Sequence, residues 1–159
     1  MEIRNHQPQT TNHNHITGFT LIELIVAMAI IAIVAASLWG NFFTSLIKGR
    51  DSRRKQDLES ISKALELYYN DARMYPTTMP AWGTVFVNPT VTGVLYMQKL
   101  PFDPSSPAID YCYKSTDQTY YQLYANMENQ SNAKITPVIC PVGGSTTYNY
   151  GISSPNVTP

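Results

Sequence analysis

The sequence predicts an α+β protein in which one long N-terminal helix precedes a small antiparallel β-sheet. No proline occurs from Phe19 to Ala72, so a single helix of about 54 residues is allowed there. From Tyr75 onward prolines are frequent, and short runs rich in valine, isoleucine and tyrosine alternate with turn residues. The first part of the chain is therefore expected to be helical and the second part β-rich.

Residues 19–39 form the most apolar stretch of the chain, with Glu23 as its one charged residue. Roughly 20 residues cross a bilayer core of about 30 Å as an α-helix. A dozen large apolar side chains, at about −0.3 to −0.6 kcal/mol each, outweigh the roughly +2.5 to +3.5 kcal/mol of one carboxylate. We expect this segment to span a membrane. The alternative reading of Glu23 is a side chain near the membrane surface that reaches water.

Residues 40–72 continue the helix as an amphipathic segment. Apolar residues recur at spacings of three and four, which places Leu58, Ile61, Leu65, Tyr68 and Ala72 on one face. We expect residues 73–159, the globular β-rich region, to pack on this face. Gly40 and Gly49 weaken the helix by up to about 1 kcal/mol each relative to alanine. Flexibility of the helix at Gly40 is one hypothesis, and a close-packed glycine is the alternative.

Basic residues gather in the run 48–55, just beyond the apolar segment. We expect a solvated helical face there, on which Asp51 pairs with Lys55 four residues later. The alternative is contact with lipid or nucleic-acid phosphates, without specific base recognition because no aromatic residues are interleaved. Taken alone, the positive-inside rule would place this run in the cytoplasm. Cys112 and Cys140, together with the run from Gly18 to Glu23, favour the opposite orientation.

The region after Ala72 contains several short candidate strands. Prolines end the helix within residues 73–80. Residues 84–87 favour a strand, and residues 94–100 fit either a strand or a short helix. Residues 109–114 and 120–127 predict a hairpin around the turn 115–118, and residues 133–140 predict a third strand. Residues 143–159 are expected to form surface coil. In the second hairpin strand an alternating apolar set is expected to face the helix, namely Tyr121, Leu123, Ala125 and Met127.

Cys112 and Cys140 are the two cysteines of the chain, and both lie in the part expected to be exported. No third or fourth metal ligand lies near them in the sequence, so a disulfide is favoured over a zinc site. Closing a loop of about 28 residues would contribute roughly 3 to 4 kcal/mol in the chain-entropy account. Two buried free thiols are the alternative.

The stretch Gly18-Phe19-Thr20-Leu21-Ile22-Glu23 places a small residue before the apolar segment, whereas an ordinary secretory signal places it after. This order resembles the class III leader of type IV pilins and type II secretion pseudopilins. The resemblance implies that residues 1–18 are a leader removed on maturation. It also implies that a prepilin peptidase cleaves after Gly18 and methylates the new amine of Phe19. In such filaments the residue matching Glu23 faces the N-terminal amine of a neighbouring subunit.

Two later motifs resemble the same family, and the fold that it implies is pilin-like. Tyr75-Pro76 just past the long helix is usual there, and the run from Leu100 to Pro104 resembles the Leu-Pro-x-Asp-Pro of major type II secretion pseudopilins. A cysteine pair near the C-terminus is more usual in type IV pilins. The sequence therefore leaves open the choice between a pilus and a secretion pseudopilus.

The resemblance implies a structural subunit that polymerises from the membrane into an extracellular filament. Its implied partners are further copies of the chain, minor pilins or pseudopilins, the prepilin peptidase, a platform protein and an assembly ATPase. The helix would cross the cell membrane once and leave the globular region outside the cytoplasm. The alternative is a signal-anchored extracellular binding domain that does not polymerise.

No enzyme chemistry is predicted. All three histidines lie in residues 1–17, so no Ser-His-Asp or Cys-His set survives removal of the leader. The formal charge is zero, and no specific nucleic-acid partner is expected. We predict no cofactor and no metal. The alternative is calcium, which secretion pseudopilins bind in their loop region, but Asp103, Asp110 and Asp117 lack the alternating spacing of a calcium loop.

Overall fold

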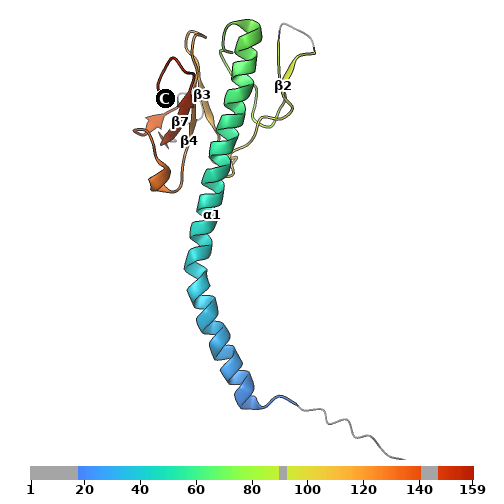
Figure 1. The fold of residues 1–159 in the computed structure, drawn as a ribbon, viewed down its shortest axis with the longest axis vertical. Helices are drawn as coiled ribbons and strands as arrows, with labels where there is room; N and C mark the ends of the chain where they lie inside the picture. Colours follow the sequence, from blue (N-terminus) through green and yellow to red (C-terminus); the bar gives the residue numbers. More distant parts are fainter. Residues whose placement is uncertain (1–17, 90–92, 141–146) are drawn as a thin grey trace, which may run out of the picture. The chain divides into compact units, whose positions relative to one another are not determined.

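The computed structural model describes residues 18–89, 93–140 and 147–159 (Figure 1). The expected leader therefore lies outside the described residues, apart from Gly18. The chain divides into two compact units, one ending at Asn41 and the other beginning at Phe42. The helix α1 (Leu21–Ala72) runs through both, as the absence of proline predicts.

The first unit contains the apolar part of α1. Its large apolar side chains from Leu21 to Trp39 are 51 to 76% exposed, and none of the most apolar 18-residue window is buried within the chain. By length and composition this is the one helix in the described part of the chain that could cross a membrane. An apolar surface of this extent needs a covering, which the described residues do not supply.

The second unit packs the amphipathic part of α1 against the β-rich region. Leu58, Ile61 and Leu65 are fully buried and Tyr68 nearly so, which confirms the predicted apolar face. They share one core with residues of the β-rich region, among them Phe86 and Leu123. The ring of Tyr68 stacks on Phe86 with 5.5 Å between the ring centres. Figure 1 shows the main sheet and β2 beside this half of α1.

The main sheet has three antiparallel strands in the order β3-β4-β7. They are β3 (Cys112–Lys114), β4 (Gln122–Ala125) and β7 (Tyr150–Ser153). Tyr124 in the central strand lies opposite Cys112 on one side and Gly151 on the other. The predicted inward set on and around β4, Tyr121, Leu123, Ala125 and Met127, is buried in the core with the helix. The predicted hairpin and its facing are thus confirmed.

Two small sheets and a short helix complete the second unit. β1 (Phe86–Val87) pairs with β2 (Leu95–Met97), so residues 94–100 contain a strand and not a helix. β5 (Val138–Ile139) pairs with β6 (Thr147–Tyr148), and η1 (Gln130–Asn132) is a single 3-10 turn. The third strand expected at 133–140 is therefore short, and it belongs to a sheet separate from the hairpin.

The expectation of surface coil over residues 143–159 was wrong for residues 147–153 and right for residues 155–159, which form no strand and are mostly exposed. β7 is the third strand of the main sheet, and Tyr148 and Tyr150 are both buried. The glycine, serine and asparagine content hid this strand, because such residues usually mark turns. Gly151 instead lies where a Cβ would be 2.8 Å from the Tyr124 ring, so the sheet requires a residue without a side chain.

Gly40 and Gly49 both lie inside α1. A Cβ built on either residue would meet no heavy atom within 4 Å outside the neighbouring helix backbone. Close packing within the chain therefore does not explain either glycine. The flexibility expected at Gly40 stays a prediction.

Candidate functional site

The N-terminal motif forms a reciprocal cap at the start of α1. The main-chain N–H and the hydroxyl of Thr20 donate to one carboxylate oxygen of Glu23, at 3.0 and 2.9 Å. The N–H of Glu23 in turn donates to the Thr20 hydroxyl at 3.3 Å. This is the capping-box arrangement, in which two otherwise unpaired N–H groups of the first turn gain partners. In the single chain Glu23 is thus held by its own helix end.

The predicted cleavage point lies just outside this cap. Gly18 and Phe19 precede the helix, both are exposed, and the Phe19 side chain is 90% exposed. No heavy atom lies within 4 Å of a Cβ built on Gly18. A peptidase can bind exposed backbone outside a helix, and the described residues leave Gly18 and Phe19 in that state. The cut after Gly18 stays a prediction.

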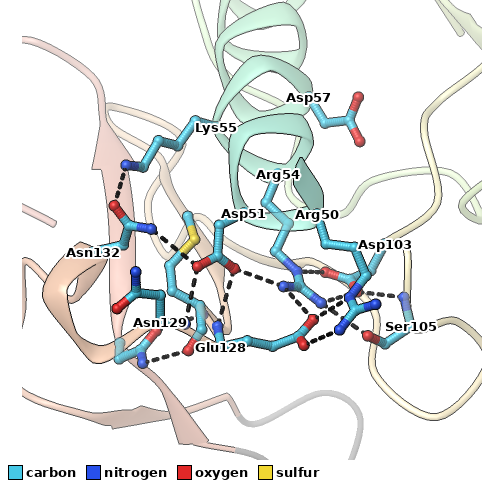
Figure 2. Close-up of polar contacts among 12 residues, drawn as sticks. Arg50, Asp51, Arg54, Lys55, Asp57, Asp103, Ser105, Glu128, Asn129 and Asn132 are labelled. Carbon is cyan, nitrogen blue, oxygen red and sulfur yellow. Dashed lines mark hydrogen bonds and ion pairs between the residues drawn. The ribbon is translucent and has the colours of Figure 1, made fainter. Parts of the chain in front are cut away.

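A buried polar network in the second unit joins residues of the basic run 48–55 to segments that pack on it (Figure 2). Arg54 is 1% exposed and forms ion pairs with three carboxylates, those of Asp51, Asp103 and Glu128. Its Nε donates to Asp103 Oδ2 at 2.9 Å, and one terminal nitrogen donates to Asp51 Oδ1 at 2.8 Å. The other terminal nitrogen reaches Asp103 Oδ1 and the Ser105 hydroxyl. One guanidinium therefore joins α1 to two distant segments.

Asp51 is the acceptor that fixes the segment around η1. Its two oxygens accept the main-chain N–H groups of Glu128 and Asn129, each at 3.0 Å, and the side-chain amide of Asn132. Figure 2 shows these bonds converging on one carboxylate from residues 128–132. Arg50 closes the network from the surface by binding both oxygens of Glu128, and Lys55 donates to Asn132 at 2.7 Å.

The network favours the charged forms of Asp51 and Glu128. Burial opposes ionisation of Asp51, but hydrogen bonds from Asn132, the main chain and Arg54 outweigh it and keep the pKa of Asp51 below its usual value. The bond from Arg50 likewise lowers the pKa of Glu128. Burial would lower the pKa of Arg54, but Asp103 and its other partners raise it instead. Every buried charge here has an opposite charge in contact, which is the condition for burying ions at all.

The predicted solvated face over residues 48–55 was therefore wrong in its centre. Asp51 does not pair with Lys55 on the surface: Asp51 is fully buried, and Lys55 bonds Asn132. The buried network was missed, although the sequence carried a signal for it. The spacing of three and four that runs through Leu58 and Ile61 continues backward to Arg54 and Asp51. Charged residues on the apolar stripe of a helix indicate a buried ion pair.

Comparison with known proteins gives a match for the N-terminal segment and another for the region that follows it. Residues 13–39 match the prokaryotic N-terminal methylation motif, and residues 41–134 match the family of type II secretion system protein G. The second match covers more than half of the chain. The chain belongs to the type II secretion system protein G family. This confirms the resemblance and, at the level of family, favours the secretion pseudopilins over the type IV pilins.

Among the relatives of this chain are three proteins that are each named type II secretion system core protein G. Those of Vibrio cholerae, Pseudomonas aeruginosa and Escherichia coli are 32, 30 and 29% identical over 94 or 95 residues. Each match covers 55% of this chain, and 64, 67 and 65% of the respective relative. The chain thus spans less than two thirds of the length of the V. cholerae and E. coli proteins. No solved structure matches significantly.

In this member of the protein G family, Cys112 and Cys140 form a disulfide, with 6.2 Å between their Cα atoms. Both are buried together with Tyr124 and Tyr148 in a second apolar cluster, on the sheet face opposite the helix. The bond joins β3 to the segment that follows β5. Tyr124, which alternates along β4 with the residues that face the helix, is therefore covered by this second cluster.

The aspartates considered for calcium do not form a shared site. Both oxygens of Asp103 bind Arg54, and Asp117 accepts from Thr119 in an exposed turn. Within residues 18–89, 93–140 and 147–159, no three His, Cys, Asp or Glu side chains come together as metal ligands. These three aspartates therefore do not gather at one point, and Arg54 is the cation that Asp103 binds.

Proposed function

We propose that this chain is a structural subunit of a type II secretion pseudopilus. In this proposal residues 1–18 are removed by a prepilin peptidase, Phe19 is N-methylated, and the mature chain polymerises from the membrane. Family membership supports the proposal. The observation that carries it is the apolar half of α1, of which the most apolar 18-residue window is not buried by the described residues, whereas the face of Leu58, Ile61 and Leu65 is buried in the core. A helix of this kind is suited first to a bilayer and then to a filament core.

The proposal assigns a separate role to each half of the molecule. The apolar helix crosses the cell membrane once, and the second unit, which holds the disulfide, lies outside the cytoplasm. Further copies of the chain, minor pseudopilins, a platform protein and an assembly ATPase are its proposed partners. No catalytic activity and no cofactor belong to the proposal. Thermal unfolding with calcium chloride and with a chelator tests the metal alternative.

Intact-mass spectrometry of the membrane-extracted protein tests the processing step. Expressed with a prepilin peptidase, the chain should begin at methylated Phe19, and without the peptidase it should retain residues 1–18. Retention of these residues in the presence of a peptidase that cleaves a control substrate would overturn the proposal and leave a membrane-anchored domain.

Substitution of Glu23 tests the assembly step. Glu23→Ala should abolish filaments while the protein still inserts into the membrane, because a carboxylate in lipid needs a partner that a neighbouring amine can supply. Thr20→Val is the matched control, since it removes the two hydroxyl bonds of the helix cap but keeps the carboxylate. Equal loss of filaments in both variants would assign the effect to the cap and contradict the assembly role.

A further inference from the structure

A groove of about 640 Å³ runs beside β3 in the second unit. Its walls come from the loop 77–82, from residues 107–116 and from Tyr148. Its volume is within the range of about 300–1,000 Å³ typical of ligand sites. Neither the predicted processing site nor the buried network around Arg54 uses this groove.

One side of the groove is an open sheet edge. The order β3-β4-β7 leaves β3 with a single partner strand, and all three residues of β3 line the groove. The N–H and C=O groups on the outer side of an edge strand are available to pair with another extended chain. The edge and the groove therefore form one surface.

The walls carry apolar side chains, the carboxylate of Asp110 and, at the end of β3, the ammonium group of Lys114. Met79, Trp82 and Ile109 provide apolar surface, and the Trp82 ring meets Tyr111 edge to face with 5.7 Å between ring centres. Asp110 provides a carboxylate whose Oδ1 is buried and has no hydrogen-bond partner. Among the described residues, it is the one buried side-chain oxygen or nitrogen without a hydrogen-bond partner. Such an atom costs about 1–3 kcal/mol until a donor reaches it.

The groove is held in shape by bonds that are already formed. The Tyr148 hydroxyl donates to the carbonyl oxygen of Asp110 at 3.0 Å, and the Tyr113 hydroxyl donates to the carbonyl oxygen of Pro76 at 2.5 Å. The disulfide anchors Cys112 in the strand itself. A preformed site loses little conformational freedom on binding, which favours affinity.

We propose that this groove binds an extended peptide segment that adds a strand to β3. Its main chain pairs with the open edge, one apolar side chain lies against Trp82, and a lysine or arginine donates to Asp110. The carboxylate of Asp110 favours a basic residue opposite it, and Lys114 in the same lining leaves the groove without a net charge. The open edge selects an extended chain over a compact small molecule. This inference does not depend on filament assembly.

Selection from a random library tests the proposal. The full chain in lipid nanodiscs carries Trp39→Phe, so that Trp82 is the only tryptophan, and a phage library of linear dodecapeptides is the probe. Enriched peptides should share a basic and an apolar residue at a fixed spacing. The synthesised peptide should shift Trp82 fluorescence, and N-methylation of its main chain should weaken binding.

Asp110→Asn is the decisive variant, because it keeps the shape of the side chain and removes its charge. It should weaken the peptide by about tenfold or more, as expected for a bond between charged groups. Asp117→Asn, in an exposed turn outside the groove, is the matched control and should bind as the parent does. Failure of the library to enrich, or equal binding by both variants, would overturn the proposal. A concentration-dependent Trp82 shift without peptide would assign the groove to a second copy and overturn it as well.

Discussion

Arg54 is the residue on which the second unit depends most. Its guanidinium, 1% exposed, is in contact with three carboxylates that come from α1, from the turn at Asp103 and from the segment before η1. A planar group with five donors can serve such a set, whereas the single ammonium of lysine cannot reproduce its directions. Without the guanidinium, the buried carboxylates of Asp51 and Asp103 lose the cation that they share, whereas Glu128 keeps its pair with Arg50.

We therefore expect Arg54→Met to destabilise the protein by about 3–5 kcal/mol, the cost of breaking a buried ion pair from one side. Arg53→Met is the matched control. Arg53 is the neighbouring arginine, its side chain is 65% exposed, and its contact with Asp57 is 3.8 Å long. Its loss should change stability by less than about 0.5 kcal/mol. Urea unfolding in detergent, followed by near-ultraviolet circular dichroism of the tyrosines, measures both. Equal effects of the two substitutions would contradict the role given to Arg54.

The network also predicts acid sensitivity. Because the pKa values of Asp51 and Glu128 are lowered in the folded protein, their stabilisation is present above about pH 4, where the unfolded acids ionise. It is lost as pH falls through the folded-state pKa values. Asp57 acts in the opposite direction, since burial raises its pKa and its protonation favours the folded state. We expect a net loss of stability between pH 5 and pH 2, measured by urea unfolding, and a flatter profile for Asp51→Asn. A parallel profile for that variant would argue against the network.

At the scale of elements, α1 shows what sequence periodicity can and cannot predict. Its continuity followed from the absence of proline, and its buried face from the spacing of Leu58, Ile61 and Leu65. The same spacing reached Arg54 and Asp51, but charge suggested a solvated surface there. The distant carboxylates of Asp103 and Glu128, brought close by the fold, make burial of that arginine favourable. Partners far apart in the sequence are what a local pattern cannot supply.

Two glycines within the elements give a further prediction. Gly49→Ala should stabilise the protein by up to about 1 kcal/mol, because alanine favours a helix and its Cβ meets no heavy atom within 4 Å. Gly151→Ala should destabilise it by about 1–3 kcal/mol, because its Cβ would lie 2.8 Å from the Tyr124 ring and 2.9 Å from Pro159. Thermal unfolding of the two variants measures both signs. Stabilisation by Gly151→Ala would show that β7 does not pack as described.

For the molecule as a whole, the parts predicted best were those with strong local signals. The motif from Gly18 to Glu23 and the apolar helix pointed to the family that the comparisons show. The last strand was missed because residues 150–153 owe their pairing to β4, a partner distant in sequence, and not to their own composition. The groove beside β3 could not be predicted at all, since its walls come from segments that only the fold brings together.

The disulfide is the covalent link within this arrangement, and its removal is the broadest test of the second unit. It closes a separation of 28 residues, for which chain entropy gives about 3–4 kcal/mol of stabilisation. Cys112→Ala with Cys140→Ala should lower the free energy of unfolding by that amount. Each single substitution should cost about as much as the pair, because either one removes the whole bond. Urea unfolding of the three variants, with the reduced parent as a further control, measures this. A loss below about 1 kcal/mol would mean that the apolar cluster of Tyr124 and Tyr148 holds β3 in place without the bond.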